Sequence, residues 1–401
     1  MPMRKSLNNG PVGVFVAIAA MALVVLLGCD SETTPAESSS VAQPAIRAVE
    51  GLFNREIPDT LGLPQIQGEH ALLYQATEEG YKFCHHPNLV VYKNRLHAMW
   101  SNGIAGEDEN GQRILSSYSG DGVTWSEPAV LIEDPDGPDG RLACVAAGYQ
   151  VDGDTLVAYY TAIVVKAPIH ADNLLYARTS PDGETWTEPQ QIADGFFIER
   201  PRALPGGRLL MPGQFADSQP RLMYTDSPDG ITGWQDGKVP PTGAFQFPEP
   251  NWFRRPDGSL VTLFRTKNEN DRLYAAASSD DGKSWSLPLE TNFLDSTARF
   301  SSGSLPDGSV YIISNPGAHL VRIPLTIALS QDGVTFDRAF VIRGEATSQR
   351  WEGLHKLAGW QYPTSLVWGD YLYVVYSINK EDVGVTRIAL SELMLKSPER
   401  K

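Results

Sequence analysis

Cysteine is scarce in this sequence of 401 residues, which contains three: Cys29, Cys84 and Cys144. So low a number excludes a disulfide-rich scaffold. Basic residues are also in deficit, because 33 Lys and Arg stand against 48 Asp and Glu and give a formal net charge of -15. That balance argues against binding to nucleic acid or to an anionic lipid surface, both of which need a basic face. Any anion that binds must be held by a local cluster of cations.

Long apolar runs are missing after the N-terminal segment, since no later stretch reaches the roughly 18 apolar residues of a membrane span. The N-terminal run, residues 12–27, follows Arg4 and Lys5 and leads into the letters LLGC. This ending resembles the bacterial lipobox, in which the cysteine is lipidated and becomes the new N-terminus. We therefore predict a lipoprotein signal peptide over residues 1–29, a lipid on Cys29 and a place in the bacterial cell envelope, with membrane contact through that lipid only. Cleavage of another type or an uncleaved anchor is the alternative.

A polar segment follows the lipobox. Residues 30–45 are rich in Ser, Thr, Pro, Ala and Glu, a composition typical of a flexible tether. The folded domain is predicted over residues 46–401. In an oxidising envelope compartment its two cysteines, Cys84 and Cys144, either pair or remain buried free thiols.

Turn-forming and aromatic residues are plentiful, with 36 Gly, 29 Pro, 9 Trp and 15 Tyr, and they favour an all-β chain. Five segments repeat an Asp-Gly turn followed by an aromatic residue, about every fifty residues, which is a period typical of propeller blades. In such a turn the Asp accepts bonds from backbone N–H groups, Gly supplies a positive φ and the aromatic ring packs on the sheet. The repeated aspartates are therefore predicted to be structural rather than metal- or substrate-binding: Asp121, Asp182, Asp229, Asp281 and Asp332.

A second set of turns recurs with a similar period. Segments such as PGGRL and PDGSL predict a hairpin between the first and second strands of each blade, and the six markers are Asn94, Gly153, Gly207, Gly258, Gly308 and Gly369. Six hairpins predict an all-β, six-bladed β-propeller. Too little chain follows the sixth hairpin for a fourth strand, so we expect a strand near His70, in HALLYQAT, to complete that blade and close the ring.

The hairpins also locate the centre of the ring. The innermost strand of each blade precedes its first hairpin, and side chains two residues apart share a face of a strand. Positions nine and seven residues before the markers should therefore line one funnel: His85, Cys144, Ile198, Glu249, Arg299 and Trp360, then Pro87, Ala146, Arg200, Asn251, Ser301 and Tyr362. Their polar members, joined by Arg265 from the next strand of blade four, predict a binding or catalytic site. The alternative is a set of residues that merely plug the ring.

These turns, the six blades and a Glu on blade four facing a Tyr on blade six resemble the sialidase (neuraminidase) superfamily and its Asp-box, or BNR, repeats. Four of the five turns are one residue shorter than the commonest Asp-box. The resemblance implies a Tyr362 nucleophile polarised by Glu249. It also implies that Asp108 is the acid/base residue, with Glu107 and Glu109 as alternatives.

The resemblance further implies three arginines that clamp a substrate carboxylate. Arg265 and Arg299 match two of them, but the first-strand motif Phe/Tyr-Arg-Ile-Pro reads Cys-His-His-Pro here, with His85 in place of Arg. A neutral imidazole cannot form the bidentate pair that a guanidinium forms with a carboxylate. The chain is thus expected to be a divergent member. Further candidates for binding substrate are His86, Arg200 and Asn251.

Three functions fit these residues. The first is an exo-acting glycoside hydrolase that releases a terminal, acidic sugar by a retaining Tyr/Glu mechanism. The second is a uronate-specific polysaccharide lyase, in which His85 or His86 and Tyr362 are base and acid and Arg299 neutralises the carboxylate. The third is a glycan-binding lipoprotein without catalysis, whose stacking platforms are Trp252, Trp351 and Trp360.

Other motifs add little. The charged turn at residues 379–382 either rims the site or is solvated. No phosphate-binding loop, Ser-His-Asp order or metal-ligand spacing is evident in the sequence, so neither a cofactor nor a metal ion is predicted.

Overall fold

The structure of this protein is a computed structural model that describes residues 42–134, 142–164, 172–266 and 271–394. The chain from Gln43 onward forms a unit of its own. The predicted signal peptide, its lipidated Cys29 and residues 30–41 of the predicted tether lie outside the described residues. No helix in the described ranges is both long enough and apolar enough to cross a membrane.

A tight turn forms at each predicted marker, after the first strand of its blade. Asn94 has a φ of 55° and Gly369 one of 57°, and the four marker glycines between them have φ values from 54° to 92°. This left-handed conformation is strained for most residues but open to Gly and, less readily, to Asn. Each marker therefore reverses the chain between the first and second strands of its blade.

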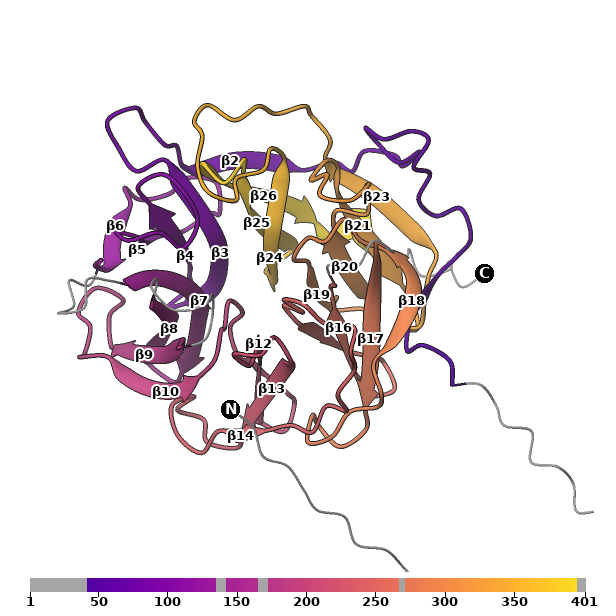
Figure 1. The fold of residues 1–401 in the computed structure, drawn as a ribbon, viewed down its shortest axis with the longest axis horizontal. Coiled ribbons are helices and arrows are strands. Elements are labelled where there is room, and N and C mark those ends of the chain that lie inside the picture. Colours follow the sequence, from indigo (N-terminus) through magenta and orange to yellow (C-terminus); the bar gives the residue numbers. More distant parts are fainter. Residues whose placement is uncertain (1–41, 135–141, 165–171, 267–270, 395–401) are drawn as a thin grey trace, which may run out of the picture. The chain divides into compact units, whose positions relative to one another are not determined.

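The strands in the described ranges form six four-stranded sheets, so the predicted six-bladed propeller is confirmed (Figure 1). Blades one to three contain β3 (Phe83–Tyr92), β4 (Arg95–Gly103), β5 (Arg113–Ser119), β6 (Ala129–Ile132), β7 (Leu142–Asp152), β8 (Thr155–Val164), β9 (Leu174–Ser180), β10 (Gln190–Asp194), β11 (Arg202–Ala203), β12 (Leu209–Gln214), β13 (Pro220–Thr225) and β14 (Gln235–Asp236). Blades four and five contain β15 (Asn251–Arg254), β16 (Leu260–Phe264), β17 (Arg272–Ser278), β18 (Leu289–Leu294), β19 (Ser301–Ser304), β20 (Val310–Ser314), β21 (Leu325–Ser330) and β23 (Arg338–Arg343). Blade six contains β24 (Trp360–Trp368), β25 (Tyr371–Ile378) and β26 (Asp382–Ala389), and the short helix α1 (Leu390–Leu393) follows it.

The fourth strand of blade six comes from the N-terminal side of the chain, as expected. β2 (Glu69–Tyr74) pairs antiparallel with β26, with Glu69 opposite Arg387 and His70 opposite Thr386. Glu69 and Arg387 also form an ion pair at 2.6 Å. Figure 1 shows β2, in indigo, beside β26, in yellow. The ring is therefore closed by hydrogen bonds between the two ends of the domain.

The segment before β2 packs on blade five. β1 (Arg47–Ala48) pairs parallel with the two-residue strand β22 (Thr335–Phe336), which lies between β21 and β23 in the chain. The Ile66 N–H donates to the Val341 carbonyl at 2.9 Å. Ile46 is fully buried among side chains of blades four and five. The packed unit thus includes Ile46, the first residue of the predicted domain.

Aspartate side chains hold the turns that follow the third strands. In the first such turn, Asp121 Oδ1 accepts the N–H of Val123 at 2.8 Å and that of Thr124 at 2.7 Å. The same pair of bonds is made by Asp182, Asp229 and Asp332. The predicted structural role is confirmed for these four aspartates.

The fourth turn differs from its prediction. Asp280, not Asp281, accepts the backbone N–H of Ser284 at 2.9 Å and the hydroxyl of Ser278 at 2.8 Å. The prediction that Asp281 holds this turn is wrong, because the chain has one extra residue between the bonding Asp and Gly282. The Asp-Gly pair in the sequence therefore indicates Asp281, although its neighbour Asp280 makes the bonds.

The hydrophobic core is divided among the seams between neighbouring blades. Each of six clusters of buried apolar side chains in the described residues joins two successive blades, as Leu366 and Trp100 do between blades six and one. Burial stabilises a fold by about 1.5–3 kcal/mol for each large apolar side chain, so the seams hold the ring together. Cys84 and Cys144 lie buried in different seams with no disulfide between them, which contradicts the alternative in which they pair.

Candidate active site

Bulges interrupt three of the innermost strands, namely β3, β7 and β24, and those in β3 and β24 contain predicted site residues. β3 has a bulge that begins at His85, and β24 has one that begins at Gln361. Within them His86 has a φ of 52° and Tyr362 a φ of 56°. A bulge re-aims the side chains of its strand, and positive φ values at residues other than Gly concentrate at functional sites. The bulges therefore decide which side chains face the site.

The expectation that Trp360 and Tyr362 share one face is wrong for this reason. Trp360 Nε1 donates to the Glu345 carbonyl at 3.0 Å, and the Arg343 guanidinium lies 3.6 Å from the Trp360 ring. The Tyr362 ring instead lies 3.8 Å from the His85 ring, measured between centroids. The bulge breaks the alternation of faces on which the expectation depended.

Three predicted residues meet around one carboxylate oxygen. Tyr362 lies on β24, Glu249 just before β15 and Arg265 just after β16. The Tyr362 hydroxyl donates to Glu249 Oε1 at 3.1 Å, and Arg265 NH2 donates to the same oxygen at 2.6 Å. Arg265 NH1 also donates to the Tyr362 hydroxyl, at 3.0 Å. All three side chains are buried, and Glu249 Oε2 has no hydrogen-bond partner among the described residues.

Burial shifts the protonation of this group. Desolvation raises the pKa of Tyr362 above its usual value, although Arg265 opposes the shift. Desolvation also raises the pKa of Glu249, again against the effect of Arg265. The phenol therefore stays protonated at neutral pH and needs a base to become a nucleophile. Glu249 is within hydrogen-bonding distance to serve as that base.

A second arginine lies beside Arg265, although the sequence pattern did not indicate it. Arg265 NH1 and Arg322 NH2 donate to the same Thr297 carbonyl, at 3.0 and 2.9 Å. Arg322 is buried, and its Nε has no hydrogen-bond partner in the described part of the chain. Arg322 lies after β20, the second strand of blade five, whereas the positions counted back from the hairpins all lie before the second strand of a blade. The available signal was its place after the second strand of blade five, since Arg265 follows the second strand of blade four.

Arg299, a predicted clamp residue, is held by a buried acid. Its NH2 group donates to Glu199 Oε1 and, at 3.2 Å, to Thr364 Oγ1. Arg299 Nε and NH1 have no hydrogen-bond partner among the residues described. Sequence reasoning missed Glu199, because it falls between the two counted positions of blade three.

The remaining predicted polar residues of this set lie in other surroundings. Arg200 has Glu199 and Tyr311 as titratable neighbours. Asn251 Oδ1 accepts the Ser302 N–H at 3.1 Å and the NH2 group of Arg202 at 3.1 Å. Asn251 therefore ties blade four to blades three and five.

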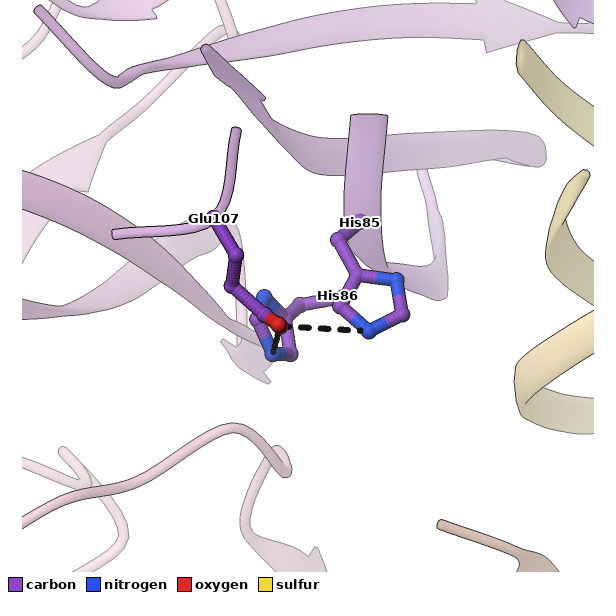
Figure 2. A group of neighbouring side chains, drawn as sticks. All are labelled: His85, His86 and Glu107. Carbon is purple, nitrogen blue, oxygen red and sulfur yellow. Dashed lines mark ion pairs between the residues drawn. The ribbon is translucent and has the colours of Figure 1, made fainter. Parts of the chain in front are cut away.

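Two histidines and a glutamate converge on the blade-one side of the site. Figure 2 shows the Glu107 carboxylate joined by dashed lines to the imidazoles of both His85 and His86. Glu107 Oε1 lies 3.5 Å from His85 Nε2 and 3.9 Å from His86 Nε2. Its other oxygen accepts a bond from Lys380 Nζ at 2.5 Å. Lys380 belongs to the charged turn at residues 379–382, so that turn rims the site.

The His85 imidazole is uncharged at neutral pH. Desolvation, and then the nearby Lys380 ammonium, hold the pKa of His85 well below its usual value. Neutral imidazole nitrogen and carboxylate oxygen are common metal ligands. The ligand atoms of His85, His86 and Glu107 lie within 4.8 Å of one another, so these three residues could hold a metal ion.

The acidic loop of blade one presents its carboxylates differently. Asp108 has a φ of 57°, and its backbone N–H donates to Gln112 Oε1 at 3.0 Å. Burial, and then the neighbouring Glu107 carboxylate, raise the pKa of Asp108 to about 7. Glu109 folds back over Gly106, where an added Cβ would lie 2.7 Å from its Oε2. Burial therefore keeps the Asp108 carboxyl partly protonated near neutral pH.

The ring of blades and the buried polar group at its centre define the class of this protein, a β-propeller with a central site. Residues 94–374, well over half of the chain, match the family model described as BNR repeat-like domain, and the chain belongs to this family. Its fold is that of the sialidase-like, Asp-box propellers.

Several solved structures are similar in fold. A sialidase matches with 19% identity and a TM-score of 0.67, over 86% of this chain and only 35% of that chain. A leech intramolecular trans-sialidase, complexed with 2,7-anhydro-Neu5Ac, matches with 13% identity and a TM-score of 0.64, over 82% of this chain and 71% of that one. A protein of unknown function from Dyadobacter fermentans matches with 15% identity and a TM-score of 0.63, over 81% of this chain and 99% of that one. At these identities the likeness extends to the fold.

Proposed function

We propose that this protein is an exo-acting glycoside hydrolase of the sialidase type, which releases a terminal acidic sugar from a glycan by a retaining mechanism. The observation that carries the proposal is the hydrogen bond from the Tyr362 hydroxyl to Glu249 Oε1, with Arg265 bonded to both groups. The likeness in fold to sialidases supports the same class of reaction.

The chemistry has two displacements. In the first, Glu249 accepts the phenolic proton while the Tyr362 oxygen bonds to the anomeric carbon of the terminal sugar. The bond from that carbon to the glycosidic oxygen breaks, and Asp108 donates a proton to the leaving oxygen. In the second, the Asp108 carboxylate takes a proton from water, the water oxygen displaces Tyr362, and Glu249 returns the phenolic proton. Two inversions retain the configuration.

The pKa of about 7 for Asp108 supports its role as the acid, because a useful fraction of this carboxyl is protonated at neutral pH. Glu107 is already engaged by Lys380 and faces both histidines. Glu109 is folded back on its own loop. These contacts favour Asp108 over its two neighbours.

An anionic substrate is favoured by the local charge. Arg265 and Arg322 lie side by side at the Thr297 carbonyl, and Arg299 adds a third guanidinium near Glu249. Because the net charge of the protein is -15, an anion can be held only by a local cluster of cations, and these arginines form such a cluster. The side chains of Tyr362, Glu249 and Arg265 are buried, and we propose that they act on the end of a glycan.

A uronate-specific lyase is the second candidate, and the position of His85 favours it. The His85 ring lies 3.8 Å from that of Tyr362, and neither of its nitrogens has a hydrogen-bond partner in the described ranges. In that reaction His85 removes the proton next to the uronate carboxylate and Tyr362 protonates the leaving oxygen. A cation neutralises the carboxylate meanwhile.

The glycan-binding lipoprotein receives less support. Two of its three expected stacking platforms, Trp252 and Trp360, are buried under arginine side chains, which leaves Trp351 partly exposed.

We also propose that the protein meets its glycan in the bacterial cell envelope, held by a lipid on Cys29. Membrane fractionation checks this anchor, and a Cys29→Ala chain that stays in the membrane fraction contradicts it.

The test is a screen of the purified protein against sialosides and uronate-rich glycans, with the products identified by mass spectrometry. Tyr362→Phe is expected to lower hydrolysis about a thousandfold or more while ligand binding remains. Tyr311→Phe is the matched control, because Tyr311 is also buried and its hydroxyl contacts Ser365 at 3.0 Å, away from Glu249. Full turnover by Tyr362→Phe contradicts the proposal, and an unsaturated uronate product supports the lyase instead.

A further inference from the structure

Two neighbouring imidazoles face the same point in this protein. In a regular strand successive side chains point to opposite faces, which would separate His85 from His86. The bulge that begins at His85 and the φ of 52° at His86 turn both rings to one side, with their centroids 4.4 Å apart. A left-handed conformation is unfavourable for a residue with a Cβ and persists where its surroundings hold it. The fold thus brings the two imidazoles together against a conformational penalty.

The His85 nitrogens are buried without partners. His85 is fully buried, and neither Nδ1 nor Nε2 has a hydrogen-bond partner among the described residues, which is uncommon for a buried polar group. Its Nε2 and that of His86 both face Glu107 Oε1 (Figure 2), at 3.5 and 3.9 Å. The three groups therefore converge on one point, at distances longer than those of ordinary hydrogen bonds.

Their spacing is close to that of a metal-ligand set. Zn–N bonds of about 2.0–2.1 Å at tetrahedral angles put neighbouring donor atoms about 3.3–3.5 Å apart. The ligand atoms of the three residues lie within 4.8 Å of one another, so the widest pair must contract by no more than about 1.5 Å to ligate one ion.

Lys380 orients the carboxylate. Its Nζ binds Glu107 Oε2 and leaves Oε1 toward the two imidazoles. Groups that hold a metal-binding carboxylate from outside fix its orientation and are part of such sites.

We propose that His85, His86 and Glu107 bind a divalent transition-metal ion such as Zn²⁺. Two imidazoles and one carboxylate leave one position of a tetrahedral ion for water or an oxygen atom of a ligand. His85 packs against Tyr362, so the ion brings positive charge beside the predicted nucleophile. An anionic or hydroxyl group of a sugar is the ligand that this position takes. Metal content is measured without substrate, so this proposal does not rest on the proposed hydrolase activity.

The experiment measures metal binding directly. The full chain is purified without a polyhistidine tag, stripped with a chelator and titrated with ZnCl₂ and, separately, with CoCl₂. We expect about one Zn²⁺ per chain by elemental mass spectrometry and the strong visible absorption of four-coordinate Co²⁺. His86→Ala and Glu107→Gln are each expected to weaken Zn²⁺ binding about tenfold or more. The matched controls are His97→Ala and Glu109→Gln, and both are expected to bind Zn²⁺ like the unaltered chain. His97 lies on β4, where its ring packs against Tyr92 and Tyr118, away from the three ligands.

The outcomes separate this proposal from the hydrolase proposal. The metal site is overturned if the unaltered chain does not bind stoichiometric Zn²⁺. It is also overturned if both ligand variants bind Zn²⁺ as tightly as the unaltered chain. Circular dichroism checks that the variants fold. Where one does not, zinc-edge X-ray absorption of the unaltered chain decides, since two imidazole ligands support the site and none overturns it. Bound zinc without turnover of any glycan supports the metal site and contradicts the hydrolase alone.

Discussion

Asp121, at a turn of a blade, and Asp108, in the candidate site, have the same side chain but pKa values shifted in opposite directions. At a turn, the N–H groups of Thr124 and Val123 lower the pKa of Asp121 to about 2. At the centre, burial and then Glu107 raise the pKa of Asp108 to about 7. Backbone donors stabilise the charged carboxylate, whereas loss of water destabilises it. In a repeat protein rich in acids, the surroundings of a carboxylate therefore distinguish the candidates for chemistry from the structural acids.

The turn carboxylates and the carboxylates of the candidate site also differ in whether they recur from blade to blade. The turn aspartates recur from blade to blade because every blade needs its turn. Glu249, Asp108 and Glu107 each come from one blade and meet side chains of other blades. Residues that depart from the repeat are thus the candidates for chemistry.

The largest expected difference between the two groups is in activity. Glu249→Gln removes the base beside Tyr362 and is expected to lower turnover about a thousandfold or more. Asp182→Asn changes a turn carboxylate in the same way and is expected to leave turnover unchanged. Steady-state kinetics on the substrate found in the screen measures both variants. Equal losses in the two would contradict the division between structural and reactive acids.

The next difference is in the pH dependence of stability. The pKa of Asp108 is raised from 3.8 to about 7, so the folded state binds more protons than the unfolded state between these values, and stability falls as pH rises through them. Asp108→Asn removes that fall. The Tm of this variant minus the Tm of the unaltered chain is therefore expected to rise by a few degrees between pH 4 and pH 8.

Asp121→Asn is expected to behave in the opposite sense. The pKa of Asp121 is lowered from 3.8 to about 2, so its stabilisation is present above pH 3.8 and is lost as pH falls toward 2. The Tm deficit of this variant should therefore be constant at neutral pH and shrink in acid. Thermal melts of both variants over this pH range check the signs, and parallel profiles would contradict the assignment.

The smallest expected difference lies within one turn. Asp280→Ala removes the acceptor for Ser284 and is expected to destabilise the protein by about 1 kcal/mol, as loss of a similar side-chain cap does in a helix. Asp281→Ala is expected to change the free energy of unfolding by less than about 0.5 kcal/mol. Urea unfolding measures the free energy of unfolding of both variants. A larger loss of stability in Asp281→Ala than in Asp280→Ala would support the original prediction that Asp281 holds the turn.

Local turn chemistry explains how much of the fold could be predicted. Asn94 and the marker glycines need positive φ values, and the turn aspartates need N–H groups just ahead, so both sets of turns are visible in the sequence. Their period gives the blades, and the missing strand of blade six gives the closure by β2. The meeting of Glu249 with Tyr362 follows from the same count.

The parts that could not be predicted depend on local irregularity or on long connections. A single extra residue moved the bond of the fourth turn from Asp281 to Asp280. The bulge in β24 separated Trp360 from Tyr362, and no repeat signal marks a bulge. Arg322 reaches the site from a connection after β20, where the strand register no longer applies.

The central claim is that Tyr362 is the nucleophile that Glu249 activates. A substrate analogue with fluorine beside the anomeric carbon and a good leaving group slows the second displacement, so the sugar stays on the enzyme. Peptide mass spectrometry is expected to find the sugar on the peptide that contains Tyr362, and to find none in Tyr362→Phe. A sugar attached to another residue, or hydrolysis of the analogue with no attached sugar, would contradict the account.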